Sequence, residues 1–155
     1  MPRRLSLLAT SALVAAVACG SPSAAGRATD DLEVGEQVTL ESDLPASLGG
    51  DGYQIVGTPA AANDSLHVTV QYAGGCQRHE FSLHASRVFM ESHPVQSPVV
   101  LHHDANGDTC RALLTRELQF DLTPLRDAWR AGYQQRHGTI ILRLRGFGDG
   151  ISYTF

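Results

Sequence analysis

The residues best suited to chemistry in this chain are two cysteines and three histidines in the middle of the sequence. Cys76 and His79 stand three positions apart, and His102-His103 precede Cys110. Thiolate sulfur and imidazole nitrogen are ligands that suit zinc and copper(I). If a turn over residues 104–108 brings Cys110 next to Cys76, His79 and one of the paired histidines can converge on the same point. One hypothesis is therefore a metal site.

Cys76 and Cys110 also suit a structural disulfide. Both lie beside glycine or turn residues, where a bridge forms without distorting a core. Thiols of exported proteins pair readily, because their compartment is oxidising. A disulfide that closes a loop of about 35 residues stabilises a fold by roughly 3 to 4 kcal/mol. We expect this disulfide, which needs no cofactor, and keep the metal site as the alternative.

Familiar catalytic motifs do not fit the spacing. His79 and Glu80 are followed by His84, one position later than the helical H-E-x-x-H zinc motif requires. The segment Asp104–Asp108 has its glycine at the fourth position of a calcium loop instead of the sixth, so a polar turn explains it better. The sequence contains neither a G-x-S-x-G nucleophile elbow nor a P-loop. We therefore expect no enzymatic activity.

The first nineteen residues read as an export signal. Two arginines precede an apolar run over residues 5–17, which has the length of a signal-peptide core and is too short for a stable membrane span. Residues 16–19, Ala-Val-Ala-Cys, resemble the relaxed lipobox of bacterial lipoproteins. In that class the chain is cut before the cysteine, whose thiol then carries acyl chains such as palmitate. The resemblance implies a signal peptide over residues 1–18 and lipidation of Cys19.

Two locations follow from the two ways of processing this leader. With lipid on Cys19, the resemblance implies anchoring in the cell envelope, and Gly20 after the cysteine implies sorting to the outer membrane. Two acyl chains hold a protein on a membrane, since each buried methylene adds about 0.8 kcal/mol. Without acylation, Ala16 and Ala18 still fit ordinary signal-peptide cleavage, and the protein would be secreted.

The rest of the chain divides into a tether and one domain. Residues 19–31 are rich in Gly, Ser and Ala and lack an apolar period, which predicts a flexible tether after the lipidated cysteine. Residues 32–155 are enough for a single domain with its own core. Within them, apolar and polar residues alternate over 66–72, 114–122, 140–144 and 151–155, which is the period of half-buried strands.

The strand pattern and one helix signal together predict the architecture. Residues 53–57 add a short strand candidate, and Thr123-Pro124 can begin a helix near residues 124–134 with Thr123 as the N-cap. Seven or eight short strands with a single helix predict a mainly β protein. We expect a small antiparallel β-sandwich, either immunoglobulin-like or an open barrel.

The domain also resembles NigD-like bacterial lipoproteins. The resemblance rests on Gly74-Gly75-Cys76, His79-x-Phe81, Cys110 and Phe120-Asp121-Leu122. It implies a β-rich architecture. It implies no reaction, because that family has no assigned activity.

Composition narrows the function classes further. The formal charge is −4 and all twelve basic residues are arginine, so the net field does not attract nucleic acid. The leader is the one apolar stretch of notable length, which excludes a polytopic membrane protein. We predict a membrane-anchored, non-enzymatic binding or structural module, whose partner is an envelope protein or a glycan. The alternative is a periplasmic or surface metal-binding protein that uses Cys76, His79, His102, His103 and Cys110.

Overall fold

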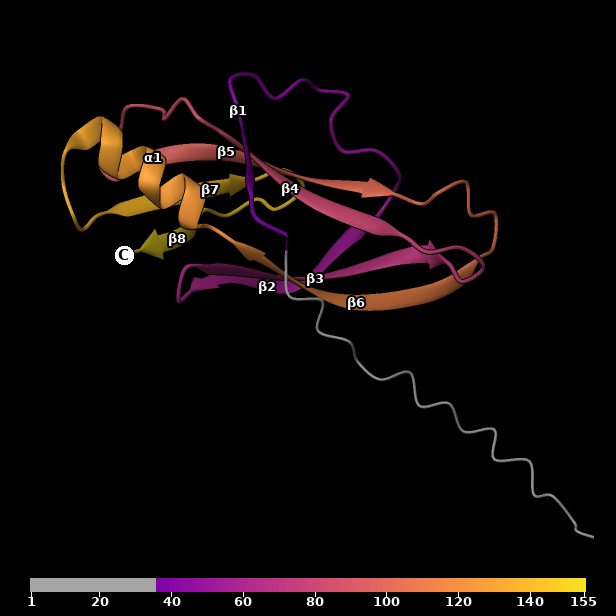
Figure 1. Cartoon of the computed structure of the whole chain (residues 1–155). Helices are drawn as coiled ribbons and strands as arrows, with labels where there is room; N and C mark the ends of the chain where they lie inside the picture. Colours follow the sequence, from indigo (N-terminus) through magenta and orange to yellow (C-terminus); the bar gives the residue numbers. More distant parts are fainter. Residues whose placement is uncertain (1–35) are drawn as a thin grey trace, which may run out of the picture. The chain divides into compact units, whose positions relative to one another are not determined.

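Two facing β-sheets and one helix make up residues 36–155, the part of the chain that the computed structural model describes (Figure 1). The predicted signal peptide, Cys19 and the whole of the predicted tether lie outside the described residues, as do residues 32–35 of the predicted domain. The strands are β1 (Thr39–Glu41), β2 (Gln54–Ala62), β3 (Ser65–Gly74), β4 (Glu80–Ser86), β5 (Val95–Asp104), β6 (Ala112–Asp121), β7 (Thr139–Leu144) and β8 (Ile151–Thr154), and the helix α1 (Thr123–Tyr133) stands between β6 and β7.

The sheets contain three and five strands. The smaller has the order β2-β3-β6, and the larger has the order β1-β4-β5-β7-β8. β3 and β6 pair along their whole length, from Ser65 opposite Asp121 to Gly74 opposite Ala112. The predicted mainly β sandwich with one helix is therefore confirmed. Among residues 36–155, no helix has both the length and the apolar composition that crossing a membrane requires.

The pairing in the larger sheet differs from the antiparallel arrangement that we expected. β1 runs parallel to β4, and β5 runs parallel to β7. Parallel neighbours need a long crossover connection, and β6 with α1 supplies it between β5 and β7. The helix thus carries the chain from the smaller sheet to the larger one and lies at one end of the sandwich (Figure 1).

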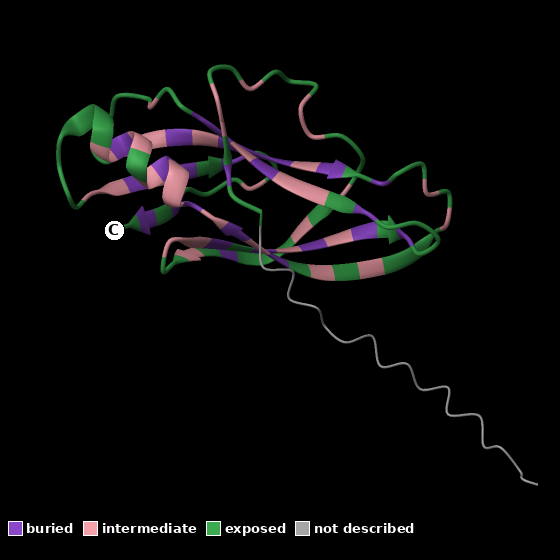
Figure 2. Ribbon diagram, viewed as in Figure 1, coloured by how far each residue is buried: buried purple, intermediate pink, exposed green. Residues whose placement is uncertain are grey.

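The core fills the space between the sheets. The alternation predicted for β3 is observed, because Leu66, Val68, Val70 and Tyr72 are all buried. Figure 2 shows the same alternation of buried and exposed residues along the strands, with exposed residues concentrated in the loops. Burial of such apolar side chains contributes about 25 cal/mol per Å² of surface removed from water, so this layer dominates the stability of the fold. The helix adds Leu125 and Trp129.

Two local predictions need correction. β2 extends beyond the predicted residues 53–57, because a register shift between Val56 and Ala60 accommodates Gly57 and Pro59 in an edge strand. The helix begins at Thr123, and the N-cap position falls on Leu122. Thr123 is therefore not the N-cap, and no N-cap side chain bonds to the helix. The Asp121 carboxylate, one residue before the N-cap, accepts the Thr123 backbone N–H at 2.8 Å.

Candidate functional site

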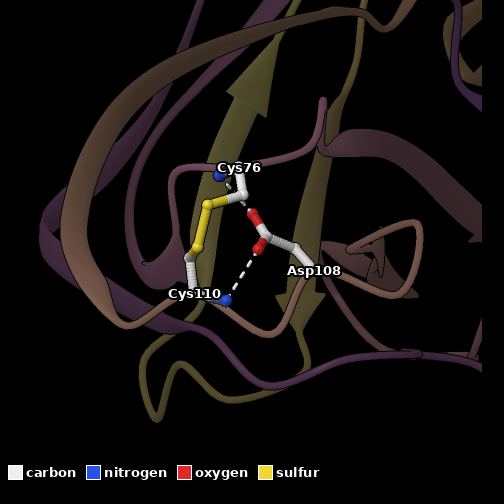
Figure 3. A group of neighbouring side chains, drawn as sticks. All are labelled: Cys76, Asp108 and Cys110. Atoms are coloured by element: carbon white, nitrogen blue, oxygen red, sulfur yellow. Dashed lines mark hydrogen bonds between the residues drawn. A yellow bond between two sulfur atoms is a disulfide. The ribbon is translucent and has the colours of Figure 1, made fainter.

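The sulfur atoms of Cys76 and Cys110 are bonded to each other in the structure, with their Cα atoms 5.8 Å apart (Figure 3). Cys76 lies in the connection between β3 and β4, and Cys110 lies in the connection between β5 and β6. These two connections lie side by side at the end of the sandwich opposite α1 (Figure 1). The disulfide therefore adds a covalent link between two loops whose ends are already brought together by the pairing of β3 with β6 and of β4 with β5.

Asp108 is the residue around which this end of the molecule is organised. One carboxylate oxygen, Oδ2, accepts the backbone N–H groups of Gly75, Cys76 and Gln77, each at 2.9 Å. The other oxygen, Oδ1, accepts the N–H of Cys110 at 2.8 Å. The amides of Cys110, Cys76 and Gln77 hold the pKa of Asp108 far below its usual value. Asp108 is therefore ionised at neutral pH and clamps both sides of the disulfide.

Two histidines continue from this carboxylate into the core. His79 Nε2 lies 3.1 Å from Asp108 Oδ2, and His79 Nδ1 lies 2.8 Å from His103 Nε2. An ionised carboxylate can only accept a hydrogen bond. His79 therefore donates from Nε2, and in the neutral ring its Nδ1 accepts from His103 Nε2. The result is a directed chain of hydrogen bonds from His103 through His79 to Asp108.

This chain is enclosed by both sheets. The side chains of His79 and Asp108 are 2% and 0% exposed, and His103 is 1% exposed. The Tyr72 ring, on the smaller sheet, lies 4.7 Å from the His79 ring and 5.2 Å from the His103 ring. Burial lowers the pKa of His103 below its usual value. The network can hold a proton in place, and its side chains are shielded from solvent.

The five residues of the metal hypothesis do not all meet. Cys76, Asp108 and Cys110 bring ligand atoms within 4.8 Å of one another, but both sulfurs belong to the disulfide (Figure 3). His79 adjoins Asp108, and His103 adjoins His79. His102, one position along β5, instead has its ring 6.2 Å from His84. A metal bound through thiolates would therefore require reduction of the disulfide.

A second hydrogen-bonded chain, which sequence reasoning missed, lies between β1 and β4. Ser82 Oγ lies 3.0 Å from His84 Nε2, and His84 Nδ1 lies 3.4 Å from Glu41 Oε1. Ser82 and His84 are two residues apart on a strand and hence share a face, which the sequence could have revealed. The parallel pairing of β1 with β4 brings Glu41 close to His84, and no local sequence pattern predicts this pairing. A serine, a histidine and a carboxylate in this order are also the elements of a hydrolytic triad.

A cleft of about 500 Å³ lies at the opposite end, beside α1. Trp129 and Tyr133 line it from the helix, His93 and Pro94 from the connection between β4 and β5, and His137 from the connection between α1 and β7. Trp129 is buried, and Tyr133 is 38% exposed. The cleft thus has an enclosed aromatic residue inside and an accessible one at its edge.

Comparison with known proteins identifies the fold. No protein-family model matches the chain. No curated protein matches it either. The solved structures that it resembles include a NigD-like immunity protein from Bacteroides caccae, with 19% identity over 77% of this chain and 58% of that chain, at a TM-score of 0.52. They also include a protein of unknown function from Bacteroides vulgatus, with 18% identity over 80% of this chain and 56% of that chain, at a TM-score of 0.47.

A third similar structure, described as that of a lipoprotein from Bacteroides fragilis, is 8% identical over 79% of this chain and 69% of its own, at a TM-score of 0.48. None of the three is named as an enzyme. The chain spans 58% of the length of the NigD-like structure. The resemblance to NigD-like proteins, first indicated by residues of the sequence, is thereby confirmed at the level of the fold.

Proposed function

We propose that this chain is a lipid-anchored envelope protein whose β-sandwich is a non-enzymatic binding module. The observation that carries the proposal is the enclosure of Asp108, His79 and His103. Acid–base catalysis needs a group within hydrogen-bond reach of the substrate. Here the carboxylate and both imidazoles instead hold two loops and the disulfide together. Side chains that could take part in a reaction instead stabilise these loops, and a rigid scaffold is what binding loops require.

The anchor in this proposal is an acylated Cys19, which would retain the protein at the outer membrane. Its support is the lipobox-like sequence Ala-Val-Ala-Cys and the apolar leader before it. The partner is an envelope protein or a glycan. The negative formal charge argues against nucleic acid as a partner.

The anchor is tested by growing cells with a labelled palmitate analogue and comparing the wild type with Cys19→Ser. We expect label and membrane retention in the wild type, and loss of both in the variant. Cys76→Ser with Cys110→Ser is the control, because it also removes thiols but leaves Cys19 in place. A soluble, unlabelled wild-type protein would overturn the anchor and favour the secreted form.

The absence of enzymatic activity is tested on the purified protein with ester, glycan and peptide substrates. Ser82→Ala is the informative variant, since Ser82, His84 and Glu41 are the hydrogen-bonded set that most resembles a hydrolytic site. A triad also needs donors for the oxyanion, and their removal alone costs about 100- to 1,000-fold in rate elsewhere. We expect no turnover in either protein. Turnover that Ser82→Ala abolishes would replace this proposal with a hydrolase.

Metal binding is the second candidate function, because Cys76, Asp108 and Cys110 offer three ligand atoms within 4.8 Å. The intact mass distinguishes the two states: the disulfide form lacks two hydrogen atoms relative to the dithiol. We expect the disulfide form in protein taken from the envelope. Free thiols with bound zinc or copper would favour the metal-binding function.

A further inference from the structure

The cleft beside α1 is lined by side chains that suit an uncharged ligand. Within the described part of the chain, the residues that line it include no Asp, Glu, Lys or Arg. They do include two aromatic rings, Trp129 and Tyr133. They also include five side chains that donate and accept hydrogen bonds: Ser92, His93, Gln135, His137 and Thr139. Its volume of about 500 Å³ is in the range of small-ligand sites.

Trp129 contributes its ring, and not its indole N–H, to the cleft. Its indole Nε1 is buried and has no hydrogen-bond partner among residues 36–155. With under 1 Å² of accessible surface, Nε1 is out of reach of a ligand that occupies the cleft as it stands. The ring itself lines the cleft and offers an apolar surface to a ligand.

The aromatic rings are held in place before any ligand arrives. The Trp129 ring lies 5.2 Å from the Phe155 ring and 5.1 Å from the Tyr133 ring. Gly138 leaves room for it, because a Cβ at Gly138 would come within 2.3 Å of the Trp129 ring. Phe89 lies 6.0 Å from Tyr133 and extends the aromatic surface beyond the cleft. A preorganised site loses less entropy on binding.

These features select one class of ligand. A ligand with a fixed charge would enter a site whose lining includes no carboxylate, ammonium or guanidinium group, and would pay a desolvation cost there. A purely apolar ligand would leave polar groups of the lining, such as Gln135, without partners. A neutral sugar ring offers apolar C–H faces for Tyr133 and hydroxyl groups for Gln135 and the two histidines. We infer that this cleft binds one or two rings of a neutral glycan, an inference that rests on the proposed function as a binding module.

The protein carries its own probe for this test, because Trp129 is its single tryptophan. The purified protein is titrated with the neutral disaccharides cellobiose, maltose, lactose and chitobiose. A disaccharide of galacturonic acid is titrated in parallel as the charged comparison. We expect a saturable change in tryptophan emission with at least one neutral disaccharide, at a Kd of about 1 mM or below. The charged disaccharide should bind at least about tenfold more weakly.

Variants assign the response to the cleft. Tyr133→Ala should weaken binding by about tenfold, the effect of losing one aromatic contact, whereas Tyr133→Phe should keep most of it. Leu113→Ala is the control, because Leu113 is 70% exposed on β6 and does not line the cleft. Equal thermal unfolding midpoints for the four proteins show that folding is intact. Binding is measured by calorimetry as well as by fluorescence, because calorimetry also detects a ligand that binds without changing the tryptophan emission.

Three results would overturn the inference: no response to any neutral disaccharide by either method, binding that Tyr133→Ala leaves unchanged, or tighter binding of the charged disaccharide. None of these concerns the anchor or the absence of turnover, which are measured on other variants. Failure here is therefore distinguishable from failure of the proposed function.

Discussion

The imidazole of His79 donates a hydrogen bond of 3.1 Å to the carboxylate of Asp108, across the two loops that the disulfide joins. Asp108 also accepts amides from both loops, so a single side chain determines how they meet. Removal of this carboxylate should therefore disturb the disulfide, the loops and the buried histidines together.

Asp108→Asn should lower the free energy of unfolding at pH 7, because an amide cannot accept at both of its ends. Amide donors lower the pKa of Asp108 in the folded state, so the unfolded chain binds its proton at a higher pH. The contribution of Asp108 is complete above the usual carboxyl pKa and is lost as the pH falls below it. The difference in the free energy of unfolding between wild type and variant, measured by urea titration, should thus decrease from pH 5 to pH 3.

The matched control for this experiment is Asp149→Asn. Asp149 is an exposed carboxylate in the connection between β7 and β8. A loss of stability in Asp149→Asn as large as that in Asp108→Asn would contradict the clamp assigned to Asp108.

His103→Phe should change how stability depends on pH between 7 and 5. Burial lowers the pKa of His103, so the unfolded chain takes up a proton that the folded chain resists, and the wild type loses stability as the pH falls. The variant keeps the stacking on Phe81, whose ring lies 4.3 Å away. It should be about 1–3 kcal/mol less stable at pH 7, because His79 Nδ1 loses its donor.

Below pH 7 the urea-derived stability of His103→Phe should fall less steeply than that of the wild type. His67→Phe, at an exposed position on β3, is the control and should retain the wild-type slope. Identical slopes for all three proteins would show that His103 does not resist protonation.

Reduction of the Cys76–Cys110 disulfide should lower the free energy of unfolding by roughly 3 to 4 kcal/mol, since the bond closes a loop with a sequence separation of 34. Urea titration with and without a reductant measures the difference. The double variant Cys76→Ser and Cys110→Ser should match the reduced protein and be insensitive to the reductant. An unchanged wild-type midpoint on verified reduction would mean that Asp108 and the strand pairing hold the loops without the bond.

Gly138→Ala should displace the Trp129 ring, because the new methyl group would come within 2.3 Å of it. Overpacking of this kind costs about 1–3 kcal/mol. Thermal unfolding measures the cost, and tryptophan emission reports the displacement. Gly148→Ala, where a Cβ meets no atom within 4 Å, should change neither. A wild-type emission spectrum in Gly138→Ala would show that the ring is less tightly held than the structure indicates.

Local pattern was a good guide to the strands. The alternation in β3 and β7 identified the buried residues because neighbouring side chains on a strand point to opposite faces. Parallel pairing was not predictable in this way: β5 and β7 are joined only through β6 and α1, and their adjacency depends on how the whole chain folds back. The predicted strand over residues 53–57 was too short, because an edge strand such as β2 tolerates both Gly57 and Pro59.

The residues of the candidate sites show the same difference between local sequence signals and long-range contacts. Cys76, His79, His103 and Cys110 drew attention through their residue types, and the structure brings them to one end of the sandwich. Asp108 looked like one more turn residue, since its role depends on amides that lie more than 30 positions earlier. Glu41 beside His84, and Tyr133 beside His93, come from distant segments and have no local signature.

The disulfide also bears on how this protein survives digestion. Arg87 is exposed and lies between Cys76 and Cys110 in the sequence. A trypsin cut after Arg87 would divide the backbone but release nothing, because the two pieces remain covalently joined through sulfur. A nicked molecule would keep its mass on a non-reducing gel, and the cleft beside α1 would stay attached to the N-terminal piece that carries Cys19.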